Sequence, residues 1–311
     1  MAQQVNVEGT RELARIIART AQSTDAGGKR AEATPKPATP CMVFTSTDWV
    51  YDGTGRNVHE DSGARGFSVY GRSKAAAEQA VAQVLGERAL ILRSALVFGP
   101  PSPINPRKRS TLGWMMDALH AREQLTVFDN EFRTPVFVHD LARAFFALTK
   151  RAAASVRAPP ETRSGSSATA PQASDPKQPP KHPQQQQQQH RLSHLFQSTT
   201  PLENARHSWY RHSTKPPADI GDGNHDGDGG GGGGALVFNM GGPERVSRLE
   251  LAMHLARVMA EPTFLVQAAS IAHDDTSRPK DVSMDSEPFW DAVGVTPTKV
   301  LDAIVQSVTS P

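Results

Sequence analysis

The chain has 311 residues and a formal net charge of +2, and 37% of its residues are hydrophobic. A near-neutral charge gives no reason to expect a nucleic-acid partner, and no apolar run approaches the roughly 20 residues of a membrane span. The single cysteine excludes a disulfide within the chain and is typical of a reducing compartment, so we expect a cytoplasmic protein. An organellar targeting peptide would be missing from this sequence if its N-terminus is incomplete.

Helix and strand patterns alternate along the N-terminal half. Residues 11–18 predict a helix, and residues 25–40 predict a short disordered insertion. Residues 42–53 begin as an apolar run and end in a polar turn, and residues 89–100 repeat that pattern before a Gly-Pro stop. Between them, residues 70–81 are rich in strong helix formers. This alternation predicts an α/β fold with a parallel sheet.

Tyr70 and Lys74 are four residues apart in the predicted helix 70–81. That spacing places two side chains on one helix face, one turn apart. A lysine cation beside a phenol stabilises the phenolate and makes tyrosine a usable proton donor near neutral pH. The same spacing also occurs by chance in surface helices, so the pattern gains weight from the strand-like runs on either side of it.

Five segments in this order resemble the extended short-chain dehydrogenase/reductase superfamily and, within it, the dTDP-4-dehydrorhamnose reductases. The segments are STDWVYDG, YGRSKAAAEQ, LRSALVFGP, RTPVFVHDLARAFFAL and FNMGGPERVSRLELA. The resemblance implies a doubly wound parallel (Rossmann-type) sheet with a small C-terminal substrate-binding part. It also implies an NAD(P)-dependent reductase of a nucleotide-activated 4-keto sugar.

The resemblance assigns a role to each polar residue around the predicted active-site helix. Tyr70 would protonate the 4-keto oxygen, Lys74 would activate Tyr70, and both would contact the nicotinamide cofactor. Thr47 would orient the carbonyl, with Ser46 as the competing hydroxyl. Successive strand residues point to opposite faces, so we expect one of these two to serve. Asp48 would assist catalysis and contact the substrate, or it would simply cap the turn.

The resemblance also implies binding roles for five further residues. Arg93 and Ser94 would contact the cofactor. Arg107 and Arg109 would contact the diphosphate of the substrate, and Arg278 would belong to the substrate-binding region. The alternative for the two loop arginines is a solvated loop, and the alternative for Arg278 is a plain turn.

The sequence upstream of residue 42 contains no glycine-rich turn of the G-x-x-G-x-x-G kind, which would hold the cofactor pyrophosphate. We therefore expect the first strand–helix units of the sheet to be absent and NADP or NAD to bind weakly. An alternative is a non-catalytic family member that acts as a binding subunit, like the regulatory subunit of methionine adenosyltransferase. The partners that we expect for this chain are a nucleotide-sugar substrate, a second copy in a homodimer, or a protein that the chain regulates.

Composition divides the chain into three parts. Residues 1–152 would form the partial Rossmann-type domain, and residues 235–311 its C-terminal part. Residues 153–234 contain a Pro/Ser/Thr-rich stretch, a glutamine run and a glycine run, and predict a long disordered insertion. Many of the 11 histidines lie in this insertion without ligand-like spacing, so we expect no metal site.

Overall fold

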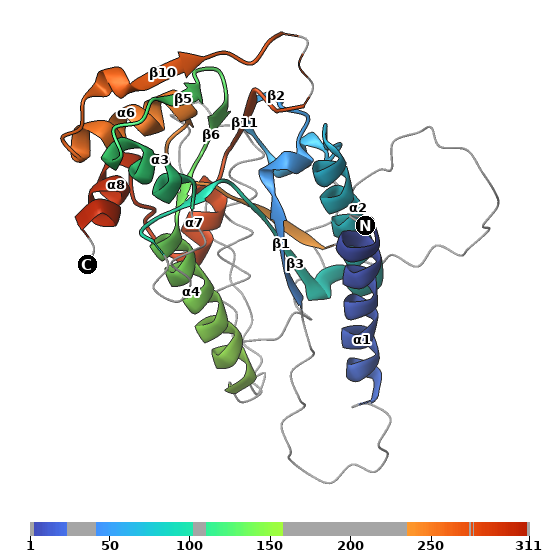
Figure 1. The fold of residues 1–311 in the computed structure, drawn as a ribbon. Coiled ribbons are helices and arrows are strands. Elements are labelled where there is room, and N and C mark those ends of the chain that lie inside the picture. The colour runs from blue at the N-terminus through green and yellow to red at the C-terminus, as the bar shows by residue number, and fades with distance from the viewer. Residues whose placement is uncertain are drawn as a thin grey trace, which may run out of the picture.

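Three parallel strands form the central sheet of the computed structural model, which describes residues 3–23, 42–101, 110–157, 235–273, 275 and 277–309. The strands are β1 (Met42–Thr47), β3 (Ala89–Ser94) and β8 (Leu236–Met240), in the order β1-β3-β8 (Figure 1). All three run in the same direction, so their carboxyl ends meet at one edge. The apolar runs at residues 42 and 89 therefore form neighbouring strands of a parallel sheet.

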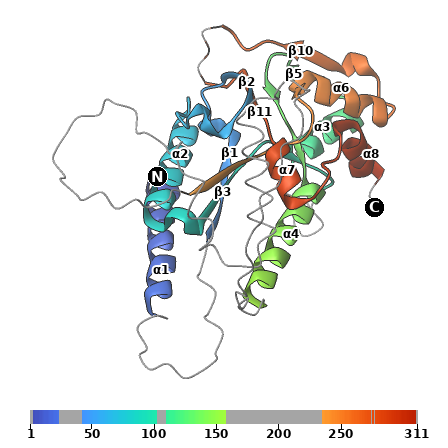
Figure 2. The ribbon, with the colours of Figure 1, turned by 180° about the vertical axis from the view of Figure 1, so that it is seen from behind.

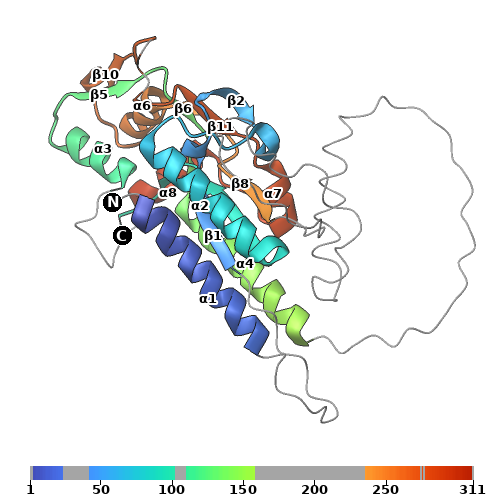
Figure 3. The ribbon, with the colours of Figure 1, turned by 90° about the vertical axis from the view of Figure 1, so that its right-hand side faces the viewer.

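Helices cover both faces of this sheet, as the predicted doubly wound fold requires. On one face, Ala14 and Val81 pack against Phe44 and Ile91. This face carries α1 (Thr10–Ser23), which follows the π-helical turn η1 (Gln3–Gly9), and α2 (Val69–Leu85), and the two helices lie side by side in Figure 3. The opposite face carries α4 (Val138–Arg157) and α7 (Glu287–Val293), which Figure 2 shows on the other side of the sheet from α1 and α2.

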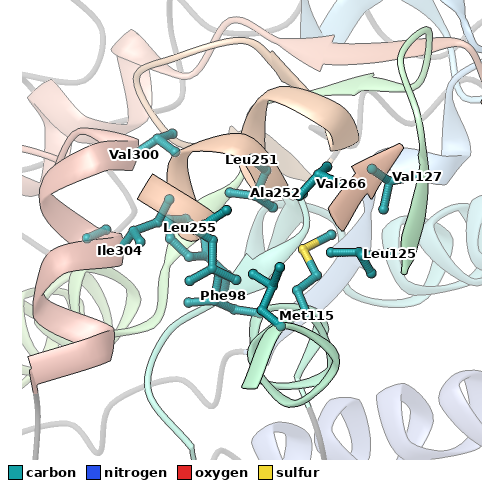
Figure 4. Packing of buried hydrophobic residues seen from close by; sticks show 14 of the residues in the cluster. Phe98, Met115, Leu125, Val127, Leu251, Ala252, Leu255, Val266, Val300 and Ile304 are labelled. Atoms are coloured by element: carbon teal, nitrogen blue, oxygen red, sulfur yellow. The ribbon is translucent and has the colours of Figure 1, made fainter. Parts of the chain in front are cut away.

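A second hydrophobic core combines residues from the middle of the chain with residues of the C-terminal part (Figure 4). Met115, Leu125, Leu255, Val266 and Ile304 meet there from five different elements. The elements are α3 (Thr111–His120), β5 (Leu125–Phe128), α6 (Arg248–Val258), β10 (Val266–Ala269) and α8 (Val300–Thr309). The strands β5 and β10 pair in parallel, so residues from both sides of the predicted insertion build this core.

A mixed sheet and several short turns connect the two cores. Its strands are β2 (Thr54–Val58), β11 (Asp281–Met284), β6 (Phe132–Arg133) and β9 (Val246–Ser247). The short elements are the strand pair β4 (Val97–Phe98) and β7 (Val136–Phe137) and the 3-10 turns η2 (Asp48–Val50), η3 (Glu60–Ser62), η4 (Gly86–Arg88) and η6 (Thr263–Leu265). A capping box begins α6, at the Ser-x-x-Glu spacing of Ser247 and Glu250: Glu250 N donates to Ser247 Oγ at 3.1 Å and Ser247 N donates to Glu250 Oε2 at 2.7 Å.

The insertion that we predicted from residue 153 begins too early, because α4 continues to Arg157 in the structure. The predicted insertion at 25–40 and the remainder of the longer one, residues 158–234, lie outside the described residues. Immediately after the longer insertion, β8 adds to the sheet beside β3. The described residues contain no helix long and apolar enough to cross a membrane. They also contain no group of three His, Cys, Asp or Glu side chains suited to a metal ion.

Candidate active site

The candidate site lies where the carboxyl end of β1 meets the first turn of α2. Ser68 caps this helix, since its Oγ accepts a hydrogen bond from Gly71 N at 3.0 Å. A Cβ atom at Gly71 would lie 2.1 Å from the carbonyl oxygen of Trp49. A side chain does not fit in that space, so the glycine lets α2 begin directly against the residues that follow β1.

The two hydroxyls at the end of β1 differ in their partners. Thr47 Oγ1 donates to Asp48 Oδ1 at 3.2 Å and accepts from Trp49 N at 3.3 Å. Ser46 Oγ is buried and has no hydrogen-bond partner among the described residues. Both candidates for the orienting hydroxyl are therefore in place, and Thr47 is the one joined to the residues that contact Tyr70.

Tyr70 lies on the first turn of α2 and is 48% exposed. Its ring meets Trp49 edge-on, with the ring centroids 6.2 Å apart. Trp49 in turn contacts Phe67 at 5.3 Å, and the guanidinium carbon of Arg133 lies 5.3 Å from the centroid of the Trp49 ring. The candidate acid therefore stands at the edge of an aromatic group and remains accessible to solvent.

Lys74 lies one helical turn after Tyr70. Its Nζ donates to the carbonyl oxygen of Thr45 at 2.8 Å and lies 4.1 Å from the centroid of the Phe44 ring. Burial lowers the pKa of the Lys74 ammonium, and the Glu78 carboxylate partly opposes that shift. An ammonium has three N–H donors, so Lys74 can still donate to a ribose hydroxyl while it is bound to Thr45.

A buried chain of charges continues from Asp48 into the C-terminal part. Arg133 Nη1 donates to Asp48 Oδ2 at 2.6 Å, and Arg133 Nε donates to Glu131 Oε1 at 3.2 Å. Glu131 also accepts from the Nε atoms of Arg248 and Arg278, each at 3.2 Å. Two carboxylates therefore hold three guanidinium groups, and the cluster keeps one net positive charge.

Burial and the arginines act in opposite directions on these two carboxylates. Burial raises the pKa of the Asp48 carboxyl, although Arg133 stabilises its charged form. Burial alone would also raise the pKa of Glu131, but the three arginines outweigh it and hold that pKa below its usual range. Glu131 therefore stays ionised as the anchor of the cluster.

Arg93, which is buried, connects β3 to α2 and to the segment that follows β1. It forms a buried ion pair with Glu78, with Nη2 and Oε2 2.8 Å apart, and its Nη1 donates to Tyr51 Oη at 2.9 Å. Burial raises the pKa of Tyr51 to about 12. Ser94 is buried as well, and its Oγ donates to the carbonyl oxygen of Ala95 at 3.1 Å. A contact of Arg93 or Ser94 with a cofactor stays a prediction.

In the structure Thr47 is hydrogen-bonded to Asp48, Trp49 contacts both Thr47 and the Tyr70 ring, and Lys74 lies on the next turn of the helix; the charge chain links Arg278 to Asp48. Arg107 and Arg109 lie outside the described residues. Sequence reasoning missed Trp49, Glu131, Arg133 and Arg248 as parts of this site. One signal was present: Glu131 and Arg133 are two residues apart in an extended segment, which places both side chains on one side.

Comparison with known proteins supplies relatives for this arrangement. A family model described as the RmlD substrate binding domain matches residues 1–162. A dTDP-4-keto-6-deoxy-D-glucose reductase of Streptomyces niveus is 34% identical over 116 residues, which cover 37% of this chain and 38% of that protein. A methionine adenosyltransferase 2 subunit beta of Xenopus tropicalis is 28% identical over 111 residues, which cover 35% of this chain and 32% of that protein. The matched segments thus span less than two fifths of either curated relative.

One solved structure illustrates the shared fold. The dTDP-4-dehydrorhamnose reductase of Bacillus anthracis, solved in complex with NADP, aligns with a TM-score of 0.54 at 14% identity. The alignment covers 97% of this chain and 71% of that one. At this identity the likeness concerns the fold alone.

Proposed function

This chain belongs to the family of RmlD substrate binding domains, within the extended short-chain dehydrogenases/reductases, and we propose that it reduces a nucleotide-activated 4-keto sugar. Such a reduction adds a hydride to the carbonyl carbon and a proton to the carbonyl oxygen. The Streptomyces niveus relative is named as a reductase of a dTDP-linked 4-keto sugar, which supports this substrate class. The family assignment agrees with the resemblance drawn from the sequence.

In this proposal Tyr70 delivers the proton to the 4-keto oxygen. With substrate bound, the Thr47 hydroxyl would turn from Asp48 to donate its one hydrogen to the same oxygen, and Lys74 would stabilise the phenolate that Tyr70 leaves behind. Ser46 is the alternative hydroxyl, since its unpaired, buried Oγ needs a hydrogen-bond partner. Asp48 holds the Thr47 hydroxyl and is held by Arg133 in turn, so it orients Thr47.

One observation carries the proposal: Trp49 contacts both the Thr47 hydroxyl and the Tyr70 ring. The backbone N–H of Trp49 donates to Thr47 Oγ1 at 3.3 Å, while the Trp49 ring contacts the Tyr70 ring at 6.2 Å. These groups come from the end of β1 and the start of α2. Thr47 and Tyr70 therefore both border Trp49, and the proposal places the substrate carbonyl there, between the hydroxyl and the solvent-accessible phenol.

The arginines held by Glu131 would bind the diphosphate of the substrate. Arg248 and Arg278 both use Nε for Glu131, which leaves their terminal Nη groups for a phosphate. Arg278 is the more exposed of the two, with 37% of its side chain accessible. The net positive charge of the cluster favours an anion at this place.

NADP or NAD would supply the hydride when it is bound. On the nicotinamide side the residues fit, because the Lys74 ammonium is fixed by Thr45 and retains donors for a ribose hydroxyl. The described residues include no glycine-rich turn suited to the pyrophosphate, so the proposal assigns no residue to that part of the cofactor.

The test is an assay of the reduction of a dTDP-linked 4-keto-6-deoxy sugar at saturating NADPH, in which the loss of NADPH absorbance measures the rate. Tyr70→Phe should lower turnover by about two to four orders of magnitude, the usual contribution of general acid–base catalysis. Lys280→Met is the control, because its Nζ donates to the carbonyl oxygen of His273 and has no part in the proposed chemistry. Equal turnover of Tyr70→Phe and the parent chain would remove Tyr70 from the mechanism.

A second candidate function is a regulatory subunit. The identity to a methionine adenosyltransferase 2 subunit beta over 111 residues favours it. In that case the chain would bind a methionine adenosyltransferase catalytic subunit and change its activity without reducing a sugar. Co-elution of the two purified proteins, in the absence of any NADPH oxidation, is the result that would favour this candidate over the reductase.

A further inference from the structure

Tyr70 has little of its own to fix the orientation of its ring. The side chain is 48% exposed, and its hydroxyl makes no hydrogen bond within the part of the chain that the structure describes. A phenol on the first turn of a helix can adopt more than one rotamer when it is this exposed. Ring contacts therefore decide where the phenol points.

The Trp49 ring provides the main contact of this kind. The planes of Trp49 and Tyr70 meet at 72°, an edge-to-face arrangement, and their centroids are 6.2 Å apart. Aromatic pairs at 4.5–7 Å in this geometry contribute about 0.5–1.5 kcal/mol beyond the area that they bury. The ring of Phe67, just before α2, also contacts the Trp49 ring, with the two ring centroids 5.3 Å apart.

Trp49 is itself held on three sides. Its backbone N–H donates to Thr47 Oγ1. Its backbone carbonyl oxygen lies so close to Gly71 that a Cβ atom at residue 71 would be 2.1 Å from it. The guanidinium of Arg133 lies against its ring, and Arg133 is fixed in turn by the buried Asp48 carboxylate. An exposed phenol therefore rests on a ring that the buried charge chain keeps in position.

We propose that Trp49 is a positioning residue for Tyr70, holding the phenol toward the Thr47 hydroxyl. The proposal gives the tryptophan of the STDW sequence a role: the residue whose carbonyl oxygen packs against Gly71 of α2 also orients the acid. The importance of Trp49 for catalysis rests on the proposed reductase function, but the orientation of the Tyr70 ring can be measured without any turnover.

The first experiment uses fluorine NMR on the full chain labelled with 3-fluorotyrosine. The sequence has three tyrosines, so the spectrum is simple, and Tyr70→Phe identifies the Tyr70 signal. In Trp49→Leu we expect that signal to narrow and to move toward the shift of an unstructured tyrosine. Trp49→Phe should restore part of the original shift, since it keeps a ring at this place.

Two comparisons separate positioning from general damage. The buried Tyr51 signal should stay unchanged in every variant, which shows that the fold is intact. Trp114→Leu removes another tryptophan, 48% exposed on α3, and should leave the Tyr70 signal unchanged. A Tyr70 signal that is the same in Trp49→Leu as in the parent chain overturns the proposal. If Trp49→Leu does not fold, an unchanged Tyr70 signal in Trp49→Met, which also removes the ring, does the same.

The second experiment divides the kinetic effect. If the chain reduces the sugar, Trp49→Leu should lower kcat about tenfold to a hundredfold, the range for a misplaced catalytic group, and leave KM within twofold. A change in KM alone would contradict a positioning role. A parent chain that reduces no sugar, with a Tyr70 signal that still responds to Trp49→Leu, rejects the proposed function and supports the positioning.

Discussion

Glu131 has no exposed surface and contacts three guanidinium groups from three segments. Taking a carboxylate out of water is costly, and the arginines offset that cost only while the carboxylate is charged. The same residue orders Arg133 beneath Trp49 and two arginines at the proposed diphosphate site. Its charge is therefore both a structural requirement and a condition for the site.

We predict that Glu131→Gln costs about 3 kcal/mol of unfolding free energy at neutral pH, since the buried Arg133 loses one of its two carboxylates and the partly exposed Arg248 and Arg278 lose theirs. The pKa of Glu131 is held below the 4.5 of a free carboxyl. The stabilisation is therefore complete above pH 4.5 and is lost as the pH falls through the folded-state pKa. Urea denaturation of both proteins at several pH values measures the difference, which should shrink in acid.

Asp281→Asn is the matched control for this prediction. Asp281 pairs with a single arginine, Arg245, whose side chain is 23% exposed, so solvent screens the interaction. We expect a much smaller loss for this variant. A cost for Glu131→Gln that is no greater than that of Asp281→Asn would show that the cluster is not held by its central carboxylate.

At the scale of the element, two helices begin in the same way but in different surroundings. Gly71 in α2 and Gly113 in α3 both donate their backbone N–H, at 3.0 Å, to the serine that caps the helix. A Cβ at Gly71 would meet the Trp49 carbonyl at 2.1 Å, whereas one at Gly113 would meet only Ser110 Oγ at 3.4 Å. The first glycine is therefore needed for close packing and the second is not.

Gly71→Ala should destabilise the chain by about 1–3 kcal/mol, as an overpacked site does, and should shift the first turn of α2 away from β1. Gly113→Ala should be neutral or stabilising by up to about 1 kcal/mol, because alanine has less freedom to lose on folding. Thermal unfolding of the two variants in parallel checks the contrast. Equal effects would mean that α2 is free to move relative to Trp49.

Elements with a strong local pattern could be predicted from the sequence. The apolar runs of β1 and β3, the helix formers of α2 and the capping box of α6 each carry their own signal. Thr47 and Tyr70 could be named because their motifs are local too. The Asp48–Arg133–Glu131 chain could not be, because its members lie up to 85 residues apart and meet only when two cores assemble. The long α4 also exceeded its predicted end, since its apolar positions fade gradually.

At the scale of the whole molecule, β1 is an edge strand of the described sheet. It pairs with β3 alone among the described strands, and Val43 on it is 44% exposed. Its six residues include no charge and no proline. Unpaired strands of this composition are templates for association with further strands.

Val43→Lys should therefore reduce concentration-dependent association while changing the unfolding free energy by no more than about 0.5 kcal/mol. Static light scattering over a concentration series measures the first quantity. Val305→Lys, at a valine that is 42% exposed on α8, adds the same charge away from the edge and should leave association unchanged. Equal scattering from both variants and the parent would exclude the β1 edge as the contact.

The place of β8 in the sheet has a consequence for synthesis. Leu92 is paired with Phe238, so the third strand leaves the ribosome long after the first two. Until then a nascent chain carries β3 with one side uncovered, for many seconds at ordinary elongation rates. We expect such a chain to need a holding chaperone during translation, and its yield to depend on how quickly the residues between 158 and 234 are translated.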